Sequence, residues 1–228
     1  MIELFRPFLN KDTIIKNLDK LFEGKTIGEG PKVKEFEDTI ANYLGQINLA
    51  MASFKVDTVA LNSGTSALHL AYILAGIKKD DEVITPVLTC SATNHPILWL
   101  GAIPVFADID PNTLNIDPLD IERKITEKTK AIVIMHNGGM PCDMDAIMSI
   151  AKGHNLKVIE DCAQALGGTY KGQKLGTFGD FAIFSFQAIK HITTGDGGML
   201  ICRNEEDAKR AKRLRWYGID KDLRRERD

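Results

Sequence analysis

The chain has 228 residues, 44% of them hydrophobic and 26% charged, and its formal net charge is −2. This balance is typical of a soluble globular domain and gives no electrostatic reason to expect nucleic acid or an anionic membrane as a partner. No apolar run approaches the roughly 20 residues that span a bilayer, and the first residues lack the pattern of a signal peptide, so we expect a cytoplasmic protein.

The four cysteines are widely spaced and form no C-x-x-C pair; they are Cys90, Cys142, Cys162 and Cys202. Such spacing favours reduced thiols and provides neither a disulfide framework nor a zinc site. We therefore expect no bound metal.

Two helices are predicted in the first part of the chain. Residues 12–22 have a helical pattern and a glycine-rich turn follows over residues 24–30, so we expect residues 1–30 to form an N-terminal arm. The next helix begins at Pro31, ends at Gly45 and carries apolar residues on one face: Val33, Phe36, Ile40 and Leu44.

From residue 58 onward, short apolar runs alternate with helical segments. The candidate strands cover residues 58–61, 82–85, 104–107, 131–135, 157–160, 181–186 and 198–202. The candidate helices cover about residues 66–75, 91–100, 117–125, 143–153 and 204–215. This alternation predicts a three-layer α/β/α fold with a mostly parallel sheet of about seven strands. We expect residues 31–228 to form one large domain, with ligands at the carboxyl ends of its strands.

The first candidate site follows the strand at residues 58–61. Gly64 allows a ligand to approach the backbone closely, and Thr65 and Ser66 offer hydroxyl groups and the free N–H groups of a helix start. This combination favours an anion site, most often for phosphate. The alternative is that a Ser or Thr here only caps the helix. We expect His69, inside that helix, to be packed.

The strand at residues 157–160 delivers Asp161 to the same sheet edge, three residues before Gln164. A carboxylate fixed there could hold a protonated ring nitrogen or a metal ion, although no set of His or Cys ligands has the spacing of a metal site. The alternative is an aspartate that caps the following turn. Residues 136–139, after the strand at 131–135, are either a polar turn or a substrate contact.

A lysine follows the very apolar strand at residues 181–186. Ser185 lies at the end of this strand, Lys190 comes five residues later, and a glycine-rich loop continues to Gly198. The loop backbone can lie against a flat ligand, and an amine placed there can act as a nucleophile. A phosphate site, a carboxylate and an amine at one sheet edge are what pyridoxal 5′-phosphate (PLP) requires. We therefore expect this cofactor, with Asp161 keeping its pyridine nitrogen protonated.

Five ordered motifs resemble the DegT/DnrJ/EryC1/StrS family of PLP-dependent sugar aminotransferases of fold type I. The motifs are GTSALHL (64–70), DDEVITP (80–86), GAIPVFADIDP (101–111), VIEDCAQALGGTYKG (158–172) and SFQAIKHITTGDGG (185–198). The resemblance extends from about residue 26 to residue 218.

The resemblance implies a role for each matching residue. Lys190 would form the Schiff base with the cofactor and carry the proton, Asp161 would pair with the pyridine nitrogen, and Gln164 would lie near the 3′-hydroxyl group. The phosphate would be held by Thr65, Ser66 and Ser185, beside the close approach at Gly64. Cys90 stands where an aromatic residue often stacks on the ring, and its thiol could pack there instead.

The resemblance also implies the reaction and the partners. The family transfers an amino group, usually from glutamate, to a keto group of a nucleotide-linked sugar, in polysaccharide or amino-sugar biosynthesis. Its members are expected to be homodimers in which a neighbouring subunit completes each site. They also continue well past this length into a C-terminal small domain. We therefore expect a fragment, a truncated product or half of a split enzyme with a separate C-terminal chain, lacking part of the substrate site.

Three alternatives are weighed against transamination. A PLP-dependent sugar dehydratase of the same fold would carry histidine where this chain has Lys190; here His191 is one position later, which favours transamination. A catalytically idle chain could still bind PLP or a nucleotide-sugar. A nicotinamide-binding Rossmann domain would need a G-x-G-x-x-G turn after its first strand, which this sequence lacks.

Overall fold

The computed structural model of the protein describes residues 9–24, 28–45 and 56–220. Its central element is a seven-stranded sheet in the order β1-β9-β8-β5-β4-β2-β3. The strands are β1 (Asp57–Leu61), β2 (Glu82–Pro86), β3 (Ile103–Ala107), β4 (Thr129–Met135), β5 (Lys157–Asp161), β8 (Phe181–Ser185) and β9 (Gly198–Cys202). In this sheet β9 runs antiparallel to β1 and β8, and the other pairs are parallel. The mostly parallel sheet predicted from the sequence is confirmed.

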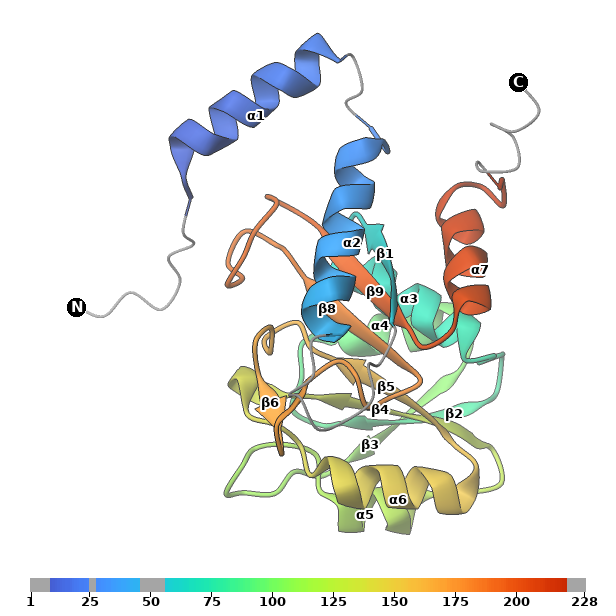
Figure 1. Cartoon of the computed structure of the whole chain (residues 1–228). Helices are drawn as coiled ribbons and strands as arrows, with labels where there is room; N and C mark the ends of the chain where they lie inside the picture. Colours follow the sequence, from blue (N-terminus) through green and yellow to red (C-terminus); the bar gives the residue numbers. More distant parts are fainter. Residues whose placement is uncertain (1–8, 25–27, 46–55, 221–228) are drawn as a thin grey trace.

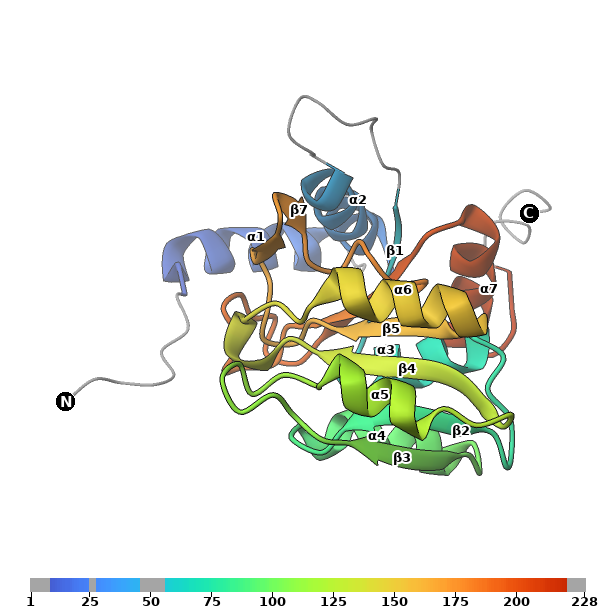
Figure 2. The same ribbon diagram turned by 90° about the horizontal axis from the view of Figure 1, so that it is seen from below.

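Helices cover both faces of the sheet (Figures 1 and 2). The helices are α1 (Lys11–Glu23), α2 (Pro31–Gly45), α3 (Gly64–Leu74), α4 (Ser91–Trp99), α5 (Pro118–Lys124), α6 (Met144–His154) and α7 (Glu205–Arg215). One face is packed by α3, α4 and α7, and the other by α2, α5 and α6. The predicted three-layer α/β/α fold is therefore confirmed, and the predicted ends of these elements differ from the observed ones by at most two residues.

Some features were not predicted or lie outside the described residues. The short hairpin of β6 (Thr169–Tyr170) and β7 (Gln173–Lys174), and the 3-10 turn η1 (Asn137–Gly139), carried no recognised signal. Residues 25–27 of the predicted glycine-rich turn lie outside the described part of the chain. Within the described part, no helix combines the length and apolar character needed to cross a bilayer. The four cysteines are all unpaired.

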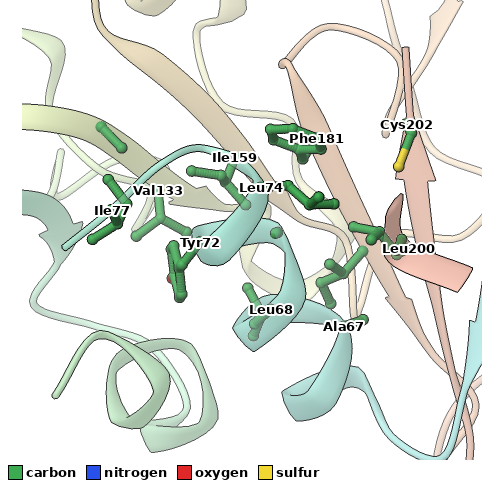
Figure 3. Close-up of a cluster of buried hydrophobic side chains, with 14 of the residues drawn as sticks. Ala67, Leu68, Tyr72, Leu74, Ile77, Val133, Ile159, Phe181, Leu200 and Cys202 are labelled. Atoms are coloured by element: carbon green, nitrogen blue, oxygen red, sulfur yellow. The ribbon is translucent and has the colours of Figure 1, made fainter. Parts of the chain in front are cut away.

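Helix α3 is fixed firmly against the sheet. Ala67 and Ala71 are fully buried, and these small side chains let the helix approach the strands closely. Its larger side chains, Leu68 and Tyr72, belong to the same buried cluster as residues of β4, β5, β8 and β9 (Figure 3). Burying such side chains stabilises the fold by about 1.5–3 kcal/mol each. The N-terminus of α3 is consequently held in one place at the sheet edge.

A buried carboxylate joins β5 to two neighbouring segments. Glu160 accepts hydrogen bonds from the N–H groups of Gly176, Phe178 and Gly179 at 2.9, 2.7 and 2.7 Å. His136 Nε2 lies 3.3 Å from the same carboxylate, and His136 Nδ1 accepts the N–H of Cys142 at 3.1 Å. The second bond assigns the ring proton to Nε2, so His136 donates to Glu160.

An arginine at the end of α7 joins this helix to α2 and β1. Arg215 Nη1 donates to Glu37 Oε1 at 2.7 Å and to the carbonyl oxygen of Ala60 at 2.9 Å, and its Nη2 pairs with Glu29. The side chains of Arg215 and Glu37 are only 13% and 7% exposed. Their pairing is therefore poorly screened by water and holds α2 and α7 together.

We expect Arg215→Gln to lower the free energy of unfolding by about 2–3 kcal/mol, because the buried Glu37 carboxylate loses its nearest positive charge and keeps only the N–H of Ala60 and the more distant Lys212. Urea unfolding followed by circular dichroism measures this loss. The matched control is Arg213→Gln, since Arg213 is 49% exposed in its pair with Asp220 and should cost less than about 1 kcal/mol. Equal losses in the two variants would contradict the bridging role.

We expect Glu160→Gln to lower the free energy of unfolding by about 2–4 kcal/mol. Both oxygens of the ionised carboxylate accept N–H groups, whereas the NH₂ group of glutamine is itself a donor and would face some of them. The same unfolding measurement applies, with Glu122→Gln at an exposed position of α5 as the control. A change as small as that of the control would mean that the turn at residues 176–179 does not depend on this carboxylate.

Candidate active site

Three parallel strands bring the predicted residues to one edge of the sheet. β1, β5 and β8 run in the same direction, so their carboxyl ends lie together. Gly64, which follows β1, lies against Ser185 at the end of β8: a Cβ added to Gly64 would be 3.1 Å from the Ser185 Cβ. A side chain at position 64 would therefore crowd Ser185, so the two segments lie in close contact here.

The start of α3 retains donors for an anion. Ser63 is the N-cap, and its Oγ accepts the N–H of Ser66 at 3.1 Å and lies 3.0 Å from the Ser66 Oγ. The capping alternative is thus realised by Ser63, and the expectation of a free Ser66 N–H was wrong. The N–H groups of Gly64 and Thr65 remain at the helix start, where the helix dipole also favours negative charge. This is the arrangement that binds a phosphate.

Asp161 is almost completely buried, with 3% of its surface exposed. Its Oδ2 accepts the hydroxyl of Thr93 at 2.8 Å, and its Oδ1 accepts the N–H of Ala163 at 3.0 Å. Burial raises the pKa of this carboxyl above its usual value, and the two hydrogen bonds and the charge of Lys190 offset only part of this rise. Asp161 therefore caps the turn after β5, as the alternative proposed, and also presents a carboxylate near Lys190.

Lys190 lies on a loop anchored by a buried aromatic residue. Phe186 is fully buried, and its ring meets that of Phe36 edge-on at 5.0 Å. The carbonyl oxygen of Phe186 accepts the N–H of Thr194 and the hydroxyl of Thr193, each at 3.0 Å. The Lys190 side chain is half-buried and makes no hydrogen bond or ion pair within residues 9–24, 28–45 and 56–220. Its amine is thus left for a ligand.

The segment at residues 136–139 is a polar turn that fixes Gln164. The N–H of Gly138 donates to Gln164 Oε1 at 2.8 Å, so the Nε2 group is the one that can face a ligand. The buried Asn115 holds this turn: its Oδ1 accepts the N–H of Asn137 at 2.9 Å, and its Nδ2 donates to the carbonyl groups of residues 140 and 141. Asn115 was missed because nothing in its local sequence distinguishes it from other loop asparagines.

Cys90 lies at the start of α4, exposed to solvent. It is the N-cap residue, but its side chain forms no capping bond, while its carbonyl oxygen accepts the N–H of Thr93 at 3.0 Å. The thiol is therefore one helical turn from the residue that contacts Asp161. Its packing on a cofactor ring stays a prediction.

A group of possible metal ligands lies behind the site. His136, Glu160 and Cys162 are buried, and their ligand atoms lie within 4.8 Å of one another. Strand pairing brings them together, which their spacing along the chain did not reveal. Both ring nitrogens of His136 and both oxygens of Glu160 already take part in hydrogen bonds. These hydrogen bonds occupy the ligand atoms of His136 and Glu160, which disfavours a metal ion there.

Two hollows open on the surface near the ends of α2 and α7. One, of about 560 Å³, includes Ser66 with Asn62 and His69 in its lining. The other, of about 1030 Å³, lies between α2 and α7, is lined mainly by charged side chains and contains none of the predicted cofactor residues. We place the candidate active site at the sheet edge of Asp161, Lys190 and the α3 N-terminus and not in the larger hollow. The reason is that these groups have the charge and the reactivity that a cofactor requires.

The groups at this edge fit PLP. The N–H groups at the start of α3 suit its phosphate, and a buried carboxylate suits a cationic ring nitrogen. A lysine amine that has no hydrogen bond or ion pair within the described part of the chain suits its aldehyde carbon. Thr65, Ser185, Asp161 and Lys190 are the residues that would hold it.

The comparisons agree with this fit. The sequence model of the DegT/DnrJ/EryC1/StrS aminotransferase family matches residues 9–227. GDP-perosamine synthase from Caulobacter vibrioides is 44% identical over 195 residues, 86% of this chain and 50% of that protein. The structure of DesI in the presence of its TDP-sugar product has a TM-score of 0.86 at 32% identity, covering 96% of this chain and 54% of that one.

A dehydratase has the same fold. The structure of GDP-4-keto-6-deoxymannose-3-dehydratase with a trapped PLP-glutamate geminal diamine has a TM-score of 0.88 at 29% identity, covering 98% of this chain and 57% of that one. The present chain spans about half the length of the curated relatives it matches. The family and the related structures with bound PLP indicate the same cofactor as the residues at this sheet edge. Because the family model matches nearly the whole of this chain, the chain belongs to the DegT/DnrJ/EryC1/StrS aminotransferase family.

Proposed function

We propose that this chain provides the cofactor-binding part of an enzyme that moves an amino group from glutamate to a keto group of a nucleotide-linked sugar. The observation that carries the proposal is that the Lys190 loop, the buried Asp161 carboxylate and the N-terminus of α3 all lie at the carboxyl ends of strands that run in one direction, β8, β5 and β1. The names of the relatives, which include a GDP-perosamine synthase and a protein with a TDP-sugar product, support a nucleotide-sugar substrate. The PLP-glutamate adduct in the related dehydratase supports glutamate as a ligand of this fold.

Each residue has a role that follows from its environment. The first turn of α3 and Ser185 bind the phosphate, and Asp161 stabilises positive charge on the ring nitrogen. Gln164, whose Oε1 accepts the N–H of Gly138, would have its Nε2 group available as a donor to the ring hydroxyl of the cofactor. Bound PLP supplies an electron sink next to the amino group. Lys190 would take the proton from the substrate carbon and deliver it to the carbon of the former cofactor aldehyde, since its amine forms no hydrogen bond or ion pair within the described residues.

Two other functions are considered, one judged by the residue at position 190 and the other by the length of the chain. A sugar dehydratase is the closest rival because one such enzyme has the same fold, and it is disfavoured by the lysine at position 190. A chain that binds PLP or a nucleotide-sugar without catalysis is the other rival, because this chain spans about half the length of its relatives.

We also propose that the protein is a homodimer. Ile189 and Ile192 flank Lys190 and are 49% and 54% exposed. Apolar side chains beside a catalytic lysine would be covered if a second subunit completed the site. Sedimentation equilibrium with PLP measures this, and a monomer at micromolar concentration would contradict it.

The direct test of function is the absorbance of the chain mixed with PLP, before and after glutamate is added. We expect a visible band from the bound cofactor, and a shift of that band to shorter wavelength when glutamate donates its amino group. A stable band that ignores glutamate would favour the idle binding chain, and no band would reject the cofactor site.

We expect Lys190→Ala to abolish covalent attachment of the cofactor. After borohydride reduction, mass spectrometry should find PLP on the peptide containing Lys190 in the unmodified chain and on no peptide of the variant. Lys152→Ala, at an exposed position of α6, serves as the control and should keep the label at Lys190. Labelling of another lysine to the same extent would reject the assignment.

A further inference from the structure

The buried carboxylate of Asp161 needs something to keep it ionised. It lies at the end of β5, on the face packed by α3 and α4, where burial disfavours charge. A neutral Asp161 could not stabilise a cationic ring nitrogen. The groups around it therefore decide whether the site can hold its cofactor.

Two donors reach this carboxylate, and they differ in kind. The N–H of Ala163 belongs to the backbone and is fixed by the turn after β5. The second donor is the hydroxyl of Thr93, a fully buried side chain on α4, whose Oγ1 lies 2.8 Å from Asp161 Oδ2. Only the second donor depends on a particular side chain.

The hydroxyl of Thr93 is itself oriented by a neighbour. Its Oγ1 lies 2.7 Å from Thr89 Oγ1. A hydroxyl has a single hydrogen to donate, so when Thr93 gives its hydrogen to Asp161 it must accept one from Thr89. The hydrogens then run in one direction, from Thr89 to Thr93 to Asp161, and such a chain strengthens the bond at its end.

The backbone of Thr93 is held from both sides. Its carbonyl oxygen accepts the hydroxyl of Tyr72 at 2.8 Å, and its N–H donates to the carbonyl oxygen of Cys90 at 3.0 Å. Tyr72 is fully buried in α3, and both burial and the charge of Asp161 raise its pKa, so its phenol stays protonated and continues to donate. These bonds fix the backbone of Thr93, and so its Cβ, beside Asp161.

We propose that Thr93, oriented by Thr89, is a positioning residue that keeps Asp161 ionised for the ring nitrogen of the cofactor. The use of the Asp161 carboxylate to bind the cofactor rests on the proposed function. The effect of Thr93 on the ionisation of Asp161 does not, and it can be measured separately. The titratable groups that face Asp161 are Lys190 on its loop, His136 after β4, Tyr72 on α3 and Cys162 next to it in the chain. Thr93 differs from them in donating directly to the carboxylate.

The test follows the carboxyl carbon of Asp161 by ¹³C NMR as pH is varied, in the chain without cofactor, with the signal assigned by its loss in Asp161→Asn. Thr93→Val removes the hydroxyl at nearly constant shape and should raise the titration midpoint by about one pH unit or more. Thr93→Ser keeps the hydroxyl and should restore the midpoint. Thr85→Val is the matched control, since Thr85 is equally buried but donates to Asn94; it should leave the midpoint unchanged.

Thr89→Val provides a second, independent variant at a half-buried position. It should raise the titration midpoint of Asp161 by a smaller amount than Thr93→Val. If Thr93→Val does not fold, this shift tests the role of the two threonines. A midpoint that is unchanged in Thr93→Val, or in Thr89→Val if only that variant folds, overturns the proposal.

Binding of PLP gives the second measurement. Thr93→Val should weaken PLP binding about tenfold, because the ionised form of Asp161 loses the hydroxyl group that stabilises it. An unmodified chain that fails to bind PLP would reject the proposed function, while the titration would still decide the role of Thr93.

Discussion

Two neighbouring carboxylates are buried where β5 ends, and the surrounding segments are arranged by the need to satisfy them. Successive residues of a strand point to opposite faces, so Glu160 and Asp161 face different helical layers. An ionised carboxylate offers about four lone-pair sites. Glu160 fills them with donors from the turn at 176–179 and from His136. Asp161 receives two donors from the chain and keeps capacity for a ligand.

This difference separates a structural carboxylate from a functional one. Replacing a donor of Glu160 disturbs the packing of β5 against its neighbours, because the group has no access to water or to a ligand. Asp161 is almost as deeply buried but is the last residue of β5, at the sheet edge where the segments that follow β1 and β8 also begin. A cationic ring in that place would replace the solvation that burial removed from the carboxylate.

The side chains of the site lie on loops, and buried contacts hold those loops in place. Phe186 packs on Phe36 and fixes the start of the Lys190 loop, while Asn115 fixes the turn that binds Gln164. The close contact between Gly64 and Ser185 fixes the two segments proposed to hold phosphate. Catalytic groups need such support, because small displacements of a reacting atom reduce rates strongly.

The sequence by itself determined the elements, the three layers and the presence of Gly64, Asp161 and Lys190 at strand ends, because periodicity and strand-to-helix alternation are local properties of the chain. The tertiary structure decided which distant residues touch. It placed Thr93 on Asp161, which is 68 residues away, brought His136 to Glu160, and gave the cap of α3 to Ser63. These contacts depend on sheet order and helix packing, which bring together distant segments. The local sequence of a segment does not indicate which other segment it will contact.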